Sequence, residues 1–222
     1  MRLSQADHAA VGAAVAAAEA RTDGEIVTVV APRSDAYHDV ALHWAVLAML
    51  GMLALLAAFP WIAERVWALV DPWAPRTPTG GLLAVALLLA TATFLLARLL
   101  LASMPLRLAL TPGSTASRRV RRRAVELFRV GTEHRTKART GVLLYLSLAE
   151  RRAEIVADEA IHSRVAPDVW GEAMAALLAA TRDGRPGEGM AAAVERIGAV
   201  LAEHFARTEG DANELSDRLV AL

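Results

Sequence analysis

The residues that could do chemistry are three acids and one histidine outside the apolar stretches of the chain. Asp158 and His162 follow a predicted strand and, in a helical segment, would lie four residues apart on one face. Glu25 opens another predicted strand, and Asp183 lies in a loop rich in glycine and proline. Clustered carboxylates suit hard cations, and a group beside a bound metal can orient an attacking water. Asp158 and His162 are therefore candidate catalytic residues, and Glu25, Asp158 and Asp183 are candidate metal ligands.

Each candidate also has a structural interpretation, which we favour. Asp158 and Glu159 would form an acidic helix start that complements the helix dipole. Asp183 would belong to an Asp-Gly turn, and Glu25 would be a solvated strand end. The sequence has no glycine loop of the phosphate-cradling kind, no HExxH motif and no Ser-His-Asp spacing. Because the chain has no cysteine, disulfides and thiolate catalysis are excluded.

Two long apolar stretches interrupt the polar chain. Residues 41–63 contain no charged residue, and residues 80–104 contain only Arg98. A membrane core needs about 20 apolar residues of helix, and a helix of this length in a soluble core carries a polar face. We therefore expect a transmembrane hairpin over 40–104, with spans at 41–63 and 80–104. Residues 64–79, which contain three prolines, are expected to form a tight external turn.

The charges are unevenly distributed although the net charge is zero. Residues 105–140 carry ten Lys/Arg against two glutamates, a net of +8, whereas residues 141–222 carry a net of −6. The positive-inside bias places both termini and the soluble domain in the cytoplasm, at a bacterial inner membrane. The basic helix within 118–139 is expected to bind anionic lipid beside the bilayer. Nucleic acid is not an expected partner, because no groove-reading or aromatic motif accompanies the basic residues.

The remaining residues, 1–39 and 105–222, predict one α/β domain that the hairpin interrupts. Apolar runs at 25–31 and 140–148 predict central strands, and 152–157 predicts the hairpin partner of the second strand. Two spans return the chain to its starting side, so the two parts of the domain can meet. The expected fold class is α/β (α+β): a small mixed sheet flanked by helices, with the membrane hairpin inserted.

Several short motifs accompany this order of elements. They are Thr22-Asp23-Gly24-Glu25-Ile26, Arg139-Thr140-Gly141-Val142-Leu143-Leu144, Glu150-Arg151-Arg152, Asp183-Gly184 with Gly189-Met190, and Asn213-Glu214-Leu215. In these motifs and their order, the chain resembles the TPM domain family, which is named for a thylakoid-lumen phosphatase, a photosystem II repair factor and a receptor auxiliary subunit. The resemblance implies a small mixed sheet flanked by helices, in agreement with the elements above.

Two functions follow from the hairpin and the resemblance. The first is a non-catalytic, membrane-anchored accessory or assembly module for a membrane or envelope complex, with a membrane protein as partner. The alternative, implied by the resemblance, is a phosphatase in which Glu25, Asp158 and Asp183 hold calcium or magnesium and His162 carries a proton. The chain differs from many members in its split domain and in having Ala157–His162 where a glycine-rich stretch often follows the third strand. The hypotheses differ in whether the four candidate side chains converge.

Overall fold

The computed structural model describes residues 3–73, 76–131, 140–208 and 215–222. Two compact units make up the chain: Met1–Asp35 with Gly113–Leu222, and Ala36–Pro112. We call the first the α/β unit and the second the hairpin unit. The chain passes between them at residues 35/36 and 112/113, whereas the apolar pattern of the sequence predicts the changes at 39/40 and 104/105.

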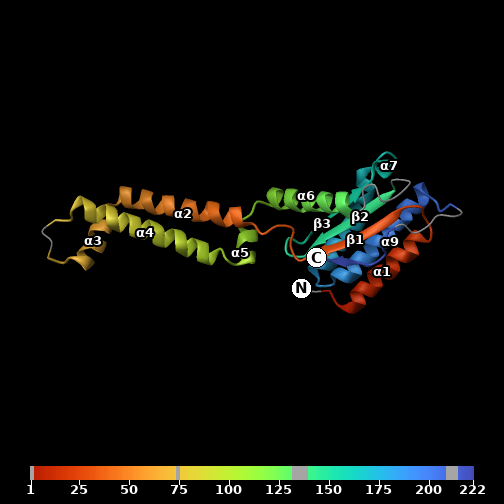
Figure 1. Ribbon diagram of the computed structural model, residues 1–222, viewed down its shortest axis with the longest axis horizontal. Helices are drawn as coiled ribbons and strands as arrows, with labels where there is room; N and C mark the ends of the chain where they lie inside the picture. The colour runs from red at the N-terminus through yellow and green to blue at the C-terminus, as the bar shows by residue number, and fades with distance from the viewer. Residues whose placement is uncertain (1–2, 74–75, 132–139, 209–214) are drawn as a thin grey trace. The chain divides into compact units, whose positions relative to one another are not determined.

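A four-stranded mixed sheet forms the centre of the α/β unit (Figure 1). Its order is β3-β2-β1-β4, with β1 at Glu25–Ala31, β2 at Gly141–Ser147, β3 at Arg152–Ala157 and β4 at Val220–Ala221. β1 pairs in parallel with β2 and β4, and β2 pairs antiparallel with β3. This architecture confirms the expected mixed sheet.

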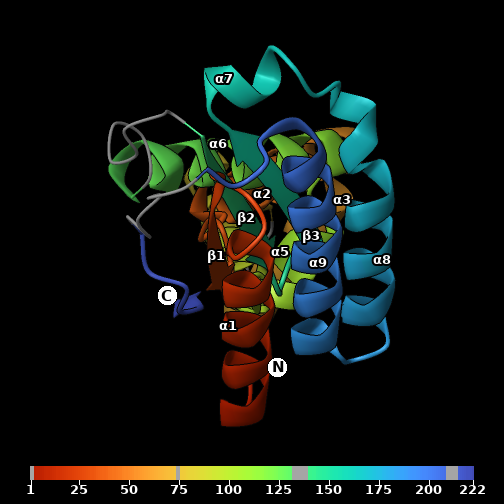
Figure 2. The same ribbon diagram turned by 90° about the vertical axis from the view of Figure 1, so that its right-hand side faces the viewer.

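Helices cover both faces of the sheet, as Figure 2 shows. α1 (Gln5–Glu19), α8 (Gly171–Arg182) and α9 (Pro186–His204) pack on the face that carries Ile26, Val30 and Leu144. α6 (Gly113–Gly131) packs on the opposite face, against Val29 and Tyr145. Because both faces are covered, β1 and β2 are apolar along their whole length instead of alternating.

Local sequence signals explain where several elements begin. Ser4 and Asp7 form the predicted capping box of α1, in which each side chain accepts a hydrogen bond from the other residue's backbone N–H. β3 is followed by the short α7 (Glu159–His162), and Pro167 opens the 3-10 turn Pro167–Trp170 that leads into α8. The buried residues of α6 are Ala116, Val120, Ala124 and Phe128.

The sequence predicts a helix over 114–135 whose inner stripe is Val120, Ala124, Leu127 and Gly131, and the structure shows that this stripe is partly wrong. Val120 and Ala124 are buried as expected, but Phe128 is the next buried residue, and Leu127 and Gly131 are only half-buried. A step of four residues from Ala124 leads to Phe128, whose larger side chain fills the space against Val29 and Tyr145. The predicted helix extends to 135, and its last part, within 132–139, lies outside the described residues.

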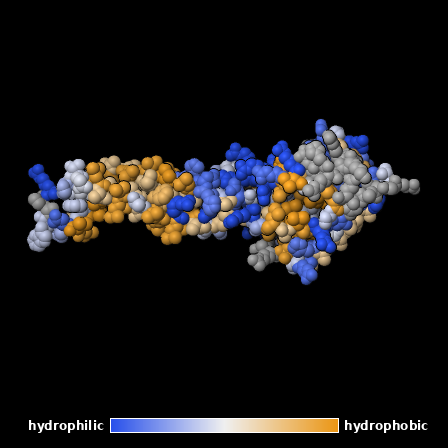
Figure 3. Space-filling view, in the orientation of Figure 1, coloured by the Kyte–Doolittle hydropathy of each residue, from blue (hydrophilic) through white to orange (hydrophobic). Residues whose placement is uncertain are grey.

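The described residues of the hairpin unit form four helices. α2 (His38–Ala58) and α4 (Thr79–Leu100) run side by side, while α3 (Trp61–Val70) and α5 (Met104–Ala109) are short (Figure 1). α2 and α4 are long and apolar enough to cross a membrane. Only 22% of the most apolar stretch of α2 and 11% of that of α4 are buried within the structure. Their middle parts present a largely hydrophobic surface (Figure 3).

The expected ends of the apolar helices and the expected tight turn between them are corrected by the structure. α2 ends at Ala58 instead of residue 63, because Pro60 cannot donate a backbone hydrogen bond to continue the helix. Residues 61–70 form α3 instead of a turn, and their apolar side packs against α4 around Ala63 and Val85. α4 likewise ends at Leu100, and Met104 begins α5.

A close contact holds α3 against α4 and gives a testable prediction. A Cβ at Gly81 would lie 2.8 Å from the Trp67 ring, whereas a Cβ at the neighbouring Gly80 would have no atom within 4 Å. We expect Gly81→Val to loosen α3 by about 1–3 kcal/mol of overpacking. Tryptic cleavage after Arg65 should then accelerate in detergent-solubilised protein.

Gly80→Val is the matched control, because it makes the same residue change one position away in the same helix. It should leave the cleavage rate near that of the parent chain. Equal acceleration in both variants would show that the Trp67 contact does not hold α3 in place.

Candidate functional site

Two of the candidate acids lie near each other at one edge of the sheet, which we call the amino edge because β1 and β2 begin there. Glu25 is in register with Gly141, and the Asp158 carboxylate accepts a hydrogen bond from the backbone N–H of Gly141 at 3.1 Å. Glu25 and Asp158 therefore flank Gly141 on neighbouring strands, at a Cα separation of roughly 10 Å.

Both acids have structural partners there. Asp158 is buried and joins the start of α7 to β2, since its own N–H donates to the Gly141 carbonyl at 2.9 Å. Glu25 is only 5% exposed, and its carboxylate accepts a hydrogen bond from the backbone N–H of Leu215 at 3.2 Å. The expectation of a solvated Glu25 is therefore wrong, because the returning C-terminal segment covers this end of β1.

The other two candidates lie apart from that pair. His162 is exposed at the end of α7. Asp183 caps the C-terminus of α8 and is followed by Gly184 with φ 84°, which is the predicted turn chemistry. The preceding residue, Arg182, lines a depression of about 320 Å³ together with Glu150 and Arg152 of the β2–β3 turn. Asp183 therefore lies toward the opposite end of β2 from Glu25 and Asp158.

The strand directions explain this separation. β3 is antiparallel to β2, so residues that follow β3 return to the amino edge. Ligands of α/β sheets usually bind at the carboxyl ends of parallel strands. In this sheet that is the other edge, where β1 and β2 end at Ala31 and Ser147. The sequence-based placement of a site after β3 did not take the direction of that strand into account.

A polar cluster occupies this carboxyl edge. The Ser34 N–H donates to the Glu150 carboxylate at 2.9 Å, and the Ser34 hydroxyl lies 3.0 Å from the Tyr145 hydroxyl. The Ser147 hydroxyl donates to the second oxygen of Glu150. Burial raises the pKa of Tyr145, an effect that the hydrogen bond with Ser34 opposes. These hydrogen bonds hold the chain in place where it leaves β1. The polar side chains of the cluster bond mainly to one another and to the backbone.

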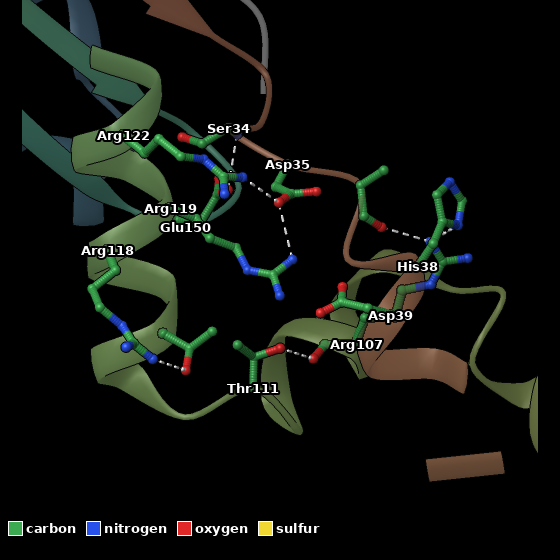
Figure 4. Close-up of polar contacts among 12 residues, drawn as sticks. Ser34, Asp35, His38, Asp39, Arg107, Thr111, Arg118, Arg119, Arg122 and Glu150 are labelled. Atoms are coloured by element: carbon green, nitrogen blue, oxygen red, sulfur yellow. Dashed lines mark hydrogen bonds and ion pairs between the residues drawn. The ribbon is translucent and has the colours of Figure 1, made fainter. Parts of the chain in front are cut away.

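Arginines of α6 hold the next residue of the same segment. Asp35 accepts from Arg119 at 2.9 Å and from Arg122 at 3.4 Å, as Figure 4 shows. Arg119 is 14% exposed, whereas Arg122 is 67% exposed and also lies 3.8 Å from Glu126. The last residue before the hairpin unit is thus tied to the basic helix.

Within the hairpin unit, Arg107 has a comparable role. Its guanidinium donates to the carbonyls of Ala36 at 2.8 Å, Leu101 at 2.5 Å and Ala102 at 3.0 Å. Figure 4 shows Arg107 beside His38 and Thr111. These three carbonyls belong to the segments that precede α2 and follow α4. One arginine therefore fastens together the two chain ends of the hairpin.

A buried carboxyl at the amino edge was missed from the sequence. Glu19, at the end of α1, is 9% exposed and accepts a 2.7 Å hydrogen bond from the Ile26 N–H. Its pKa is raised to about 8, mainly by burial and further by the charges of Glu25 and Asp217. The hydrogen bond from Ile26 has the opposite effect and lowers the pKa. An acid that ends an amphipathic helix gives no sequence signal of burial, because only the return of the C-terminal segment encloses it.

The described residues do not form a metal site of the usual kind. Among them, no group of three or more His, Asp or Glu side chains is arranged to hold an ion. Glu25 and Asp158 lie on either side of Gly141, and Asp183 and His162 do not join them. The carboxylates hold backbone segments in place, and the arginines can bind anions. Among the described candidate residues, no acid and base face each other across a shared pocket.

Comparison with known proteins relates the second half of the chain to a domain family. Residues 104–200 match the family model described as the TPM domain. The chain is similar in fold to the solution NMR structure of the BA42 protein from the psychrophilic bacterium Bizionia argentinensis, with a TM-score of 0.58 and 17% identity. That alignment covers 100% of this chain and 97% of the other. No curated protein matches.

The matched residues include α6, β2, β3, α7, α8 and most of α9, while α1, β1 and β4 lie outside the match. This confirms the resemblance inferred from the motifs around the central strands. Residues 104–200 of the chain therefore match the TPM domain.

Proposed function

We propose that this chain is an integral membrane protein in which α2 and α4 anchor the TPM domain at the cytoplasmic face of a bacterial inner membrane. There the domain acts as a non-catalytic accessory or assembly module for a membrane or envelope complex. The observation that carries this proposal is the exposure of large apolar side chains along both helices.

The exposure distinguishes a membrane anchor from other apolar helices. A helix in a soluble core would be mostly buried, but α2 and α4 bury only 22% and 11% of their most apolar stretches. Leu83, Leu87 and Leu99 of α4 are each more than 60% exposed. A lipid environment would remove these side chains from water at about 25 cal/mol per Å². A secretory signal is one apolar segment, whereas this chain has a pair of apolar helices that pack side by side.

The orientation rests on charge. Arg107 and the five arginines between positions 118 and 123 follow α4 closely in sequence, whereas the segment between α2 and α4 pairs Arg65 and Arg76 with Glu64 and Asp71. By the positive-inside rule, the side that carries the termini and the TPM domain is the cytoplasm.

The non-catalytic role is supported by what the polar groups do. Asp158, Glu25 and Glu150 each accept hydrogen bonds from backbone N–H groups of neighbouring segments. A carboxylate that secures backbone in this way is not available to orient a cation or an attacking water without losing that contact. The use of these polar groups therefore supports a role in binding more than a role in catalysis.

The proposal predicts no cation-dependent phosphomonoester hydrolysis by the detergent-purified full chain. Turnover with magnesium or calcium should equal that of an Asp158→Asn/Asp183→Asn variant and remain at background. In parallel, cross-linking in membranes followed by affinity purification should recover one reproducible membrane protein.

Two results would overturn the proposal. Cation-dependent turnover that the double variant loses would establish a phosphatase and locate its site. Recovery of chaperones only, in the absence of turnover, would argue against an accessory module.

A further inference from the structure

The outward side of α6 is a basic surface with no role in the domain core. The helix carries six arginines against one acid, Glu126. Its inward residues Val120, Ala124 and Phe128 are buried against the sheet. Arg118, Arg122 and Arg129 are exposed and, at steps of four and seven residues, form one line along the outward side. We call these three residues the arginine line.

The partners available within the domain neutralise only part of this charge. Asp35 pairs with Arg119 and Arg122, and Glu126 pairs with Arg122 and Arg123. Arg122 and Arg123 remain 67% and 43% exposed despite these contacts. Among the described residues, Asp35, Glu126 and Glu154, which interacts with the charge of Arg121, thus face six arginines of α6, and this leaves a surplus of positive charge.

Only two residues of chain separate Asp35 from the first residue of α2. Asp35, to which Arg119 and Arg122 are bonded, is followed after two residues by His38, the first residue of α2. Three residue steps span at most about 11 Å even when fully extended. If α2 enters a bilayer, the basic end of α6 therefore cannot leave the neighbourhood of the lipid headgroups.

We propose that the arginine line binds the phosphates of anionic lipid headgroups in the leaflet where the hairpin begins and ends. This inference rests on the membrane anchoring proposed above and names a second partner for the anchored domain. The arginines are spaced by roughly 6 and 10 Å along the helix, which suits separate headgroups more than one compact ligand. Guanidinium groups bind phosphate through paired hydrogen bonds as well as charge.

The experiment uses the full chain in vesicles and exploits its lack of cysteine. Val125 lies on the outward side between Arg122 and Arg129, so a fluorophore on Val125→Cys reports on this surface. The vesicles contain a lipid with a nitroxide quencher on its headgroup, in phosphatidylcholine with or without phosphatidylglycerol. Quenching should be stronger with phosphatidylglycerol and should fall at high salt, because salt screens exposed charges.

The test variant is Arg118→Gln/Arg122→Gln/Arg129→Gln in the same labelled chain. Loss of three arginines near an anionic surface should lower the local association constant by roughly 100-fold, removing the effect of phosphatidylglycerol. The control, Arg151→Gln/Arg182→Gln/Arg196→Gln, removes the same charge from other elements of the α/β unit and should retain the effect. Matching thermal unfolding of both variants shows that the fold is intact.

The outcomes separate this inference from the anchoring itself. Protein that floats with alkaline-washed vesicles but is quenched equally with and without phosphatidylglycerol overturns the lipid contact and leaves the anchor standing. Persistence of the phosphatidylglycerol effect in the test variant also overturns the role of the arginine line. Protein that does not float overturns both proposals.

Discussion

Replacing Leu87 and Leu88 with arginine is expected to abolish stable membrane integration of the chain. These side chains lie near the middle of α4 and are 69% and 63% exposed. On the biological insertion scale, each leucine-to-arginine change at the centre of a span costs about 3–4 kcal/mol. The fraction of protein that resists alkaline carbonate extraction should fall from nearly all of the protein to a small part of it.

The control is Leu106→Arg/Leu110→Arg, which adds the same charge to the segment after α4. Those leucines are 45% and 38% exposed and lie on the proposed cytoplasmic side. Arginine there agrees with the positive-inside bias, so integration should persist. If α4 were instead a helix exposed to water, arginines at positions 87 and 88 would make the protein more soluble than the parent chain. That would be the opposite outcome.

The second large effect is on the pH dependence of stability, through Glu19. Its pKa is about 8 in the folded chain, mainly because it is buried, against an ordinary value of 4.5. The folded state therefore binds the proton more tightly, and its stabilising effect is complete below pH 4.5 and is lost as the pH rises toward 8. Each pKa unit corresponds to about 1.4 kcal/mol, so the loss can reach about 5 kcal/mol.

Glu19→Gln should remove this dependence. The glutamine oxygen can still accept the hydrogen bond from the Ile26 N–H, and the side chain does not ionise. The free energy of unfolding of the α/β unit, measured by urea titration, should decline more steeply with pH in the parent than in the variant. The difference between them should grow up to about pH 8 and then level off.

Glu203→Gln provides the comparison, because Glu203 is an exposed acid of α9. It should leave the pH profile of the parent chain unchanged. Parallel profiles for the parent and Glu19→Gln across the same range would show that Glu19 is ionised in the folded protein.

Much of the fold could be predicted because its main signals are local. The apolar runs of β1 and β2, the capping box of Ser4 and the hairpin between β2 and β3 each depend on adjacent residues. Because two membrane-crossing helices return the chain to the side on which it started, the sequence also indicated that the two parts of the domain can meet. Pro60 was also a local signal, and its effect on the end of α2 could have been predicted from its missing N–H.

The candidate site was less predictable because it depends on long-range pairing. Burial of Glu25 and Glu19 requires the C-terminal segment, which is more than 190 residues away from Glu19 along the chain, to return alongside β1. The separation of Asp183 from Asp158 follows from the antiparallel direction of β3, which the predicted hairpin implies but which the placement of the candidate site did not use. The candidate acids, which the sequence suggested as one set, therefore hold different parts of the backbone in the folded chain.

The central claim is that α2 and α4 cross the membrane and hold the TPM domain on the cytoplasmic side. Single cysteines can test it directly, with Thr79→Cys at the start of α4 and Ser163→Cys on the α/β unit, both at exposed positions. A membrane-impermeant maleimide applied to intact bacterial spheroplasts should label Thr79→Cys, and should label Ser163→Cys only after lysis. Labelling of both positions under the same condition would mean that the helices do not span the membrane, and the reverse pattern would contradict the orientation.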